Sequence, residues 1–98
     1  MMLNKFISVL EQAQAQHELD VVDLVVLNDL AANGEGTIMN ILKRPKLFAA
    51  ATRHGHIKKL CERGFLNKKE VPGNMRFKTI SLSDKATDVL KKLEGVAA

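Results

Sequence analysis

Eleven lysine and arginine residues lie between Lys43 and Lys78, a segment that contains only two acidic residues. The first 42 residues have the opposite balance, with one lysine against six acids, and the last twenty carry three of each sign. Formal charge therefore changes from −5 to +9 between adjacent blocks. Basic side chains that neutralise phosphates release condensed counterions, so this block favours a polyanionic partner. Nucleic acid is the first interpretation, and an anionic membrane surface or an acidic protein is the alternative.

Three side chains of this block are possible metal ligands: His54, His56 and Cys61. Residues two positions apart on a helix point about 200° away from each other, so the two imidazoles cannot converge on one ion. His54 and Cys61 are two turns apart, and the sequence supplies no obvious further pair. Cys61, next to Leu60, is interpreted as a small half-buried apolar residue, with a redox thiol near Lys58 as the alternative. No metal or other cofactor is predicted.

Catalytic motifs are absent from the sequence. It has no nucleophile elbow, glycine-rich phosphate loop, HExxH motif or spaced carboxylate pair, and Gly34-Glu35-Gly36 is interpreted as a loop between helices. No catalytic residue is therefore predicted, and the chain is not expected to be an enzyme. Trp and Tyr are missing and only four Phe are present, which weakens the case for a base-stacking platform.

Cysteine usage and hydropathy indicate the compartment. A single cysteine cannot form an internal disulfide, which is typical of a reducing cytoplasm. No apolar run reaches the length of a signal sequence or a membrane-spanning helix. We therefore expect a cytoplasmic protein with no membrane partner.

Apolar periodicity and capping residues predict the helices that position the basic block. Helices are expected over residues 3–17, 21–33, 37–44 and 49–63. Asp20 and Thr37 are suitable N-caps, Pro45 ends the third helix, and Gly34 and Gly64 suit helix ends. The second helix is apolar around most of its circumference and is expected in the core.

The pattern changes after Gly64. Residues 65–71 and 76–82 are short segments rich in β-forming residues, and the turn-forming residues 72–75 lie between them, which predicts a β-hairpin. Ser83 then caps a final helix that ends near residue 94. A short helix, a tight turn, a second helix and a hairpin make a winged helix-turn-helix.

The predicted fold class is α+β, mostly α: a winged helix-turn-helix with flanking N- and C-terminal helices. Ninety-eight residues are enough for one modest core, so residues 1–98 are interpreted as one domain. It comprises an N-terminal helix (1–18), the winged core (21–82) and a C-terminal helix (83–94).

The second helix of the helix-turn-helix has a small and polar face that becomes basic towards its end, which suits a DNA major groove. The wing is expected on the minor groove or the phosphate backbone. Arg53 lies on the core side by periodicity, and it either extends outward or touches DNA near the helix start. A solvated helix face and edge-strand lysines that prevent aggregation are the alternatives. The predicted DNA-contacting residues are Lys46, Ala50, Ala51, Thr52, Arg53, His54, Lys58, Lys68, Lys69, Asn74, Arg76 and Lys78.

Two segments resemble a known family. Residues 57–66 (IKKLCERGFL) resemble the end of the recognition helix and the entry to the wing in MarR-type winged-helix regulators, and residues 79–86 (TISLSDKA) resemble the step into the next helix. The resemblance implies a dimeric transcription regulator that binds double-stranded DNA, with helix 49–63 in the major groove. A winged-helix module that acts in replication or mobile-element control, and binds protein or DNA without sequence preference, is the alternative. No small-molecule effector is predicted.

The terminal helices carry apolar residues that the winged core does not obviously need. Surplus apolar surface at helical spacing favours a homodimer interface, whereas the alternative is that the first helix closes the chain's own core. The predicted interface residues are Leu3, Phe6, Ile7, Leu10, Val89, Leu90 and Leu93.

Overall fold

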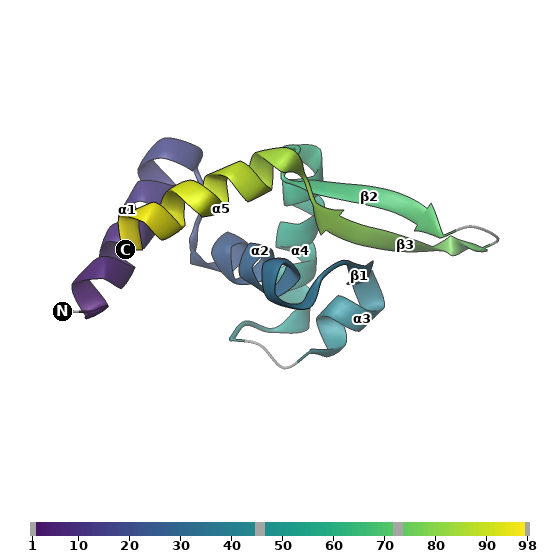
Figure 1. Ribbon diagram of the computed structural model, residues 1–98. Helices are drawn as coiled ribbons and strands as arrows, with labels where there is room; N and C mark the ends of the chain where they lie inside the picture. The colour runs from purple at the N-terminus through teal and green to yellow at the C-terminus, as the bar shows by residue number, and fades with distance from the viewer. Residues whose placement is uncertain (1, 45–46, 72–73, 98) are drawn as a thin grey trace.

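The computed structural model describes residues 2–44, 47–71 and 74–97, and for residues 71 and 74–77 it describes the backbone alone. In these described residues, five helices and a small three-stranded antiparallel sheet form an elongated arrangement of 49 × 25 × 20 Å (Figure 1). The predicted fold class is confirmed. In chain order the elements are α1 (Met2–His17), α2 (Val21–Asn33), β1 (Gly36–Thr37), α3 (Ile38–Lys43), α4 (Ala50–Glu62), β2 (Leu66–Val71), β3 (Asn74–Leu82) and α5 (Asp84–Ala97).

Side-chain caps begin the helices where the sequence predicts them. The Asp20 carboxylate accepts from the Asp23 N–H at 2.9 Å, and the Asp23 carboxylate accepts from the Asp20 N–H at 3.0 Å, which makes a capping box at α2. Thr37 accepts from the Asn40 N–H, and Ser83 caps α5. Each cap satisfies a backbone N–H that has no partner within its helix.

Beyond shifts of one residue, the structure differs from the predictions in three places. Strand β3 begins at Asn74, two residues before its predicted start and inside the segment predicted as a turn. Gly36 and Thr37 form strand β1, which pairs with Ile80 and Thr79 of β3, so the interpretation of Gly36 as part of a loop was wrong. A two-residue strand has no periodicity of its own and is defined by its distant partner. α5 continues to Ala97, three residues past its predicted end. Pro45, the predicted end of α3, lies outside the described residues.

The core joins α2 and α4 to the sheet and to the short helix α3. Its fully buried side chains include Leu27, Ile57, Leu60, Phe65 and Ile80. Burying a side chain of this size contributes about 1.5–3 kcal/mol. No helix in the described part of the chain is long and apolar enough to span a membrane.

The terminal helices α1 and α5 pack side by side at the end of the molecule opposite the wing (Figure 1). Ala13 of α1 and Leu19, just after it, are fully buried, and Val89 and Leu93 of α5 belong to the same core. The first helix therefore closes part of the chain's own core, as one of the two interpretations proposed.

Candidate nucleic-acid interface

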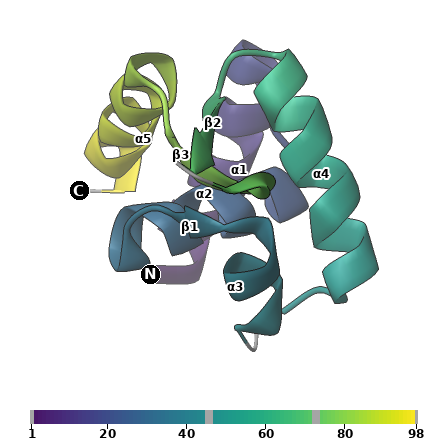
Figure 2. The same cartoon turned by 90° about the vertical axis from the view of Figure 1, so that its right-hand side faces the viewer.

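Helix α4 presents one face to the core and the other to solvent. Its buried residues are Arg53, Ile57 and Leu60, whereas Gly55 is exposed, as are Ala51 one turn before it and Lys58 and Lys59 one turn after it. Viewed along the hairpin, α4 lies on one side of it and α5 on the other (Figure 2). Of the predicted DNA contacts on α4, the exposed ones are Ala50, Ala51, Thr52, His54 and Lys58.

The hairpin of β2 and β3 carries the other basic residues. Lys68 and Lys69 are exposed on β2, and Lys78, paired with Glu70 across the ladder, is half-buried. Strand β2 packs against α4, so the lysines of β2 and those of α4 belong to neighbouring elements. The side chains of Asn74 and Arg76, and the whole of Lys46, lie outside the described part of the structure.

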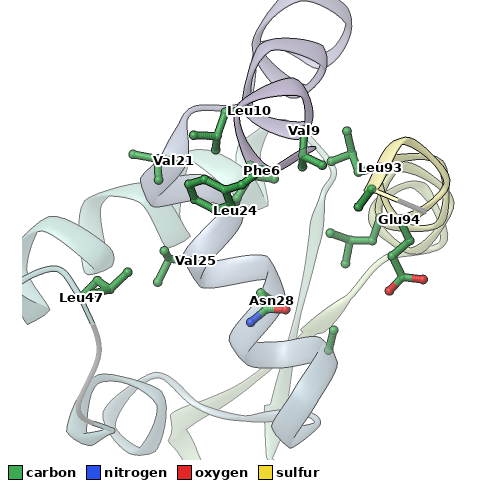
Figure 3. Close-up of a pocket in the computed structure, with 13 residues that line it drawn as sticks. Phe6, Val9, Leu10, Val21, Leu24, Val25, Asn28, Leu47, Leu93 and Glu94 are labelled. Carbon is green, nitrogen blue, oxygen red and sulfur yellow. The ribbon is translucent and has the colours of Figure 1, made fainter. Parts of the chain in front are cut away.

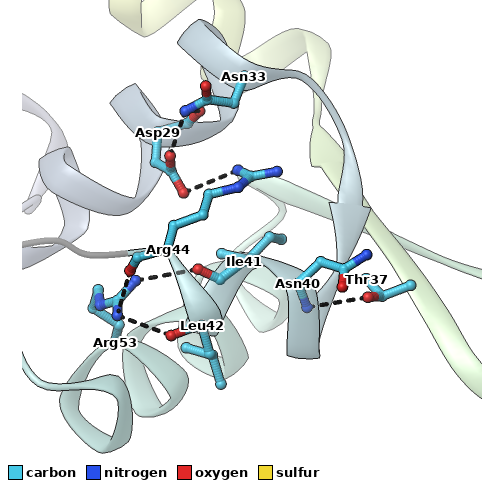
Figure 4. A network of polar contacts seen from close by, with 8 residues as sticks. All are labelled: Asp29, Asn33, Thr37, Asn40, Ile41, Leu42, Arg44 and Arg53. Carbon is cyan, nitrogen blue, oxygen red and sulfur yellow. Dashed lines mark hydrogen bonds and ion pairs between the residues drawn. The ribbon is translucent and has the colours of Figure 1, made fainter.

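Arg53 is not on the exposed face of α4, and its prediction as a DNA contact was wrong. The side chain is 5% exposed, and its guanidinium donates to the carbonyl oxygens of Ile41, Leu42 and Arg44 at 3.2–3.3 Å (Figure 4). It also donates to the carbonyl oxygen of Phe48 at 2.9 Å. The last carbonyls of a helix have no intrahelical partners, and a cation at that end is favoured by the helix dipole. Arg53 therefore stabilises the end of α3 and the turn that follows it.

The other two described arginines of the basic block are also engaged by the protein itself. Arg44 forms an ion pair with the buried Asp29 at 3.1 Å (Figure 4). Arg63 donates to the carbonyls of His17 and Glu18 at 2.8 and 2.9 Å, where α1 ends. The count of basic residues along the sequence could not distinguish these arginines, which bind groups within the protein, from the cations that are exposed on its surface. Among the described side chains, the exposed cations of α4 and the hairpin are Lys58, Lys59, Lys68 and Lys69, which together are called the lysine surface below.

His56 faces α2 and not the exposed face of α4. Its Nδ1 lies 2.7 Å from the Asp23 carboxylate and 3.6 Å from that of Asp20. These three groups have ligand atoms within 4.8 Å of one another, so they are the described residues best placed to share a cation. Both carboxylates already accept backbone hydrogen bonds of the capping box. The sequence analysis did not find this cluster, because it considered the spacing of possible ligands within one helix, whereas these three residues come from α4 and the start of α2.

Cys61 is half-buried beside the core, as predicted. Burial raises the pKa of its thiol; Lys68 lowers this pKa and Glu62 raises it, both by smaller amounts. Desolvation penalises the thiolate, so the protonated form dominates at neutral pH. This environment disfavours the alternative interpretation of a reactive thiol.

The predicted dimer residues divide into three groups by their exposure. Leu3, Phe6 and Ile7 are 61%, 54% and 43% exposed on α1. Val89 and Leu93 are each 5% exposed, so the prediction that they face a partner was wrong. The physical reason is that α5 packs its apolar stripe against α1 and the sheet of the same chain. Leu10 and Leu90 are half-buried.

An apolar pocket of about 310 Å³ lies between α1, α2 and α5 (Figure 3). Phe6 and Leu24 point into it, and Leu47, from the segment before α4, closes one side. Asn28 and Glu94 are its polar lining residues. Phe6, one of the lining residues, is also 54% exposed on α1.

Comparisons with solved structures identify the fold. BpsR of Bordetella bronchiseptica, whose DNA binding is regulated by 6-hydroxynicotinic acid, is 20% identical, with a TM-score of 0.73 over 98% of this chain and 72% of that one. YusO of Bacillus subtilis is 16% identical, with a TM-score of 0.77 over 97% and 66%. Reduced AbfR bound to DNA is 18% identical, with a TM-score of 0.73 over 97% and 69%. The chain thus spans about two thirds of the length of these relatives.

No protein-family model and no curated protein matches the sequence. The structural likeness nevertheless covers nearly the whole chain, including α1, the helix-turn-helix, the hairpin and α5. The chain therefore has the winged-helix fold of the MarR-type transcription regulators.

Proposed function

We propose that this protein is a transcription regulator that binds double-stranded DNA with α4 in the major groove and the wing, residues 65–82, on the minor groove or backbone. The observation that carries the proposal is the lysine surface formed by α4 and the base of the hairpin. Four exposed lysines among the described residues form this surface, on a fold shared with AbfR, which is described as bound to DNA. Lysine side chains on such a surface neutralise phosphates and so favour a nucleic acid over an uncharged partner.

The exposed cations of this surface are lysines, and this restricts how the protein could recognise a DNA base sequence. Arginine reads guanine through two parallel hydrogen bonds, which a lysine ammonium reproduces less well. Arg44, Arg53 and Arg63 are all engaged inside the protein. Sequence preference on α4 is therefore assigned to the exposed polar residues Thr52 and His54, while the lysines supply affinity that is largely independent of sequence.

A homodimer completes the proposal. Leu3, Phe6 and Ile7 expose apolar surface at the end of the molecule opposite the wing, so a partner there leaves the lysine surface free (Figure 1). A two-fold dimer would set two recognition helices about 34 Å apart, matching the half-sites of a palindrome.

Fluorescence anisotropy with a labelled duplex tests the proposal. We expect the logarithm of the association constant to fall linearly with the logarithm of salt concentration, with a slope of about −0.9 per phosphate contact. A flat salt dependence would contradict DNA binding. Competition between genomic and random duplexes separates a sequence-specific regulator from a module without sequence preference, because only the former prefers particular genomic fragments.

A further inference from the structure

Gly55 lies in the middle of α4, where glycine is unfavourable. Five helical residues precede it and seven follow it, and its backbone is not in the left-handed region, unlike that of Gly34 and Gly64. In a helix interior, glycine has more conformational freedom to lose than alanine and removes side-chain packing. The presence of glycine at this position, despite its cost to helix stability, therefore requires a structural or functional explanation.

The reason is not found inside the described part of the chain. A Cβ built on Gly55 has no atom within 4 Å, so a side chain would enter open space. Gly36 provides the contrast, because its Cβ would lie 3.3 Å from Arg44 Nη2. Neither backbone conformation nor packing explains the missing side chain at Gly55.

The surroundings of Gly55 are those of the proposed interface. Ala51 lies one turn before it and Lys58 and Lys59 lie one turn after it, and all three are exposed. The neighbouring His54 is exposed as well. At Gly55 the helix backbone is therefore exposed without a side chain over it, next to the ammonium groups of Lys58 and Lys59 and the imidazole of His54.

We infer that Gly55 is the point of closest approach of α4 to the base edges of a DNA duplex, and that it determines specificity by the side chain that it lacks. This inference rests on the proposed function. An uncovered backbone lets the helix sit deep in the major groove, which brings the side chains of Thr52 and His54 within reach of base edges. A methyl group at this position would hold the helix away from the bases while the longer lysines still reach phosphates.

Gly55→Ala tests the inference, and Gly95→Ala is its matched control. Gly95 is also an exposed helical glycine whose Cβ would have no atom within 4 Å, but it lies in α5. Both substitutions should leave the protein folded and raise Tm by a few degrees, since alanine favours the helix. Two probes are used: a duplex that the wild-type protein selects from a random-sequence pool, and a duplex of scrambled sequence.

For Gly55→Ala we expect binding to the selected duplex to weaken about tenfold, with a larger loss for Gly55→Leu. Binding to the scrambled duplex and the salt slope should stay at wild-type values, because no charge has changed. Gly95→Ala should bind both duplexes like the wild type. Gly55→Ala binding the selected duplex as tightly as the wild type would overturn the inference and leave the proposed function standing. A wild-type protein that binds no duplex would overturn both.

Discussion

His56 Nδ1 of α4 lies 2.7 Å from the Asp23 carboxylate in the first turn of α2. Asp23 is 6% exposed, and its carboxylate also accepts from the backbone N–H of Asp20. The residue that ties α4 to α2 thus belongs to the cap that begins α2. The opposite face of α4 is the proposed DNA-binding surface. The contact between His56 and Asp23 therefore holds that surface in a defined position relative to α2 and the core.

Replacing His56 with alanine should destabilise the fold. The substitution removes the hydrogen bond to the largely buried Asp23 carboxylate, which is expected to cost about 1–3 kcal/mol in the free energy of unfolding. Urea denaturation measures the change. His54→Ala, on the exposed face of the same helix, is the control and should lie within about 0.5 kcal/mol of the wild type. Equal losses for the two variants would show that the Asp23 contact contributes nothing.

Arg53→Met should be more damaging than either histidine variant. Four backbone carbonyls lose a charged donor, so we expect a loss of about 3 kcal/mol or more in the free energy of unfolding. Lys58→Met, on the exposed face, should change stability by less than about 0.5 kcal/mol. Where Arg53→Met remains folded, the salt slope of duplex binding should equal that of the wild type. A reduced slope would mean that Arg53 contacts phosphate after all.

Charge reversal at the lysine surface should weaken duplex binding. Lys58→Glu and Lys68→Glu each remove one phosphate contact, so affinity for all sequences should fall together and the salt slope should become shallower by about 0.9. Lys92→Glu makes the same charge change on the exposed surface of α5 and should have a much smaller effect. If all three variants weakened binding alike, net charge and not this surface would govern affinity.

The proposed dimer depends on the exposed apolar residues of α1. Sedimentation of the wild type at micromolar concentration should give about twice the chain mass of 10.8 kDa. Leu3→Asp should dissociate the dimer, because it places a charge in an apolar interface. Ser8→Asp puts the same charge on an exposed position of α1 away from the apolar stripe and should leave the dimer intact. A wild-type protein that sediments as one chain would refute the interface.

Burial raises the pKa of the Cys61 thiol, so alkylation of the folded protein at mildly alkaline pH should be slower than that of the urea-unfolded chain. Lys68→Ala should slow it further and Glu62→Gln should speed it, because the two charges act on this pKa with opposite signs. The folded state keeps the proton more tightly than the unfolded state. The resulting stabilisation is present at neutral pH and is lost as pH rises above the thiol pKa of the unfolded chain. A folded-state rate equal to the unfolded one would contradict this assignment.

The sequence by itself determined the fold class and the order of the helices and the hairpin. Asp20, Thr37 and Ser83 are local signals, because a cap bonds to a backbone N–H only a few residues away. The hairpin was equally predictable, since β-forming segments on both sides of a turn-forming segment specify a local pairing. The exposure of Lys58 followed from the helical periodicity of residues 49–63.

Only the tertiary structure decided which lysine and arginine side chains are exposed to a DNA partner and which are bound within the protein. Arg53 could face the core because helix α3 ends against it and offers carbonyl oxygens, a relationship between residues up to twelve positions apart. Val89 and Leu93 became core residues because α1 packs beside α5 across almost the whole length of the chain. Strand β1 exists only because β3 lies next to it. Periodicity reports which side of an element is apolar, whereas the identity of the neighbour that covers it depends on contacts distant in sequence.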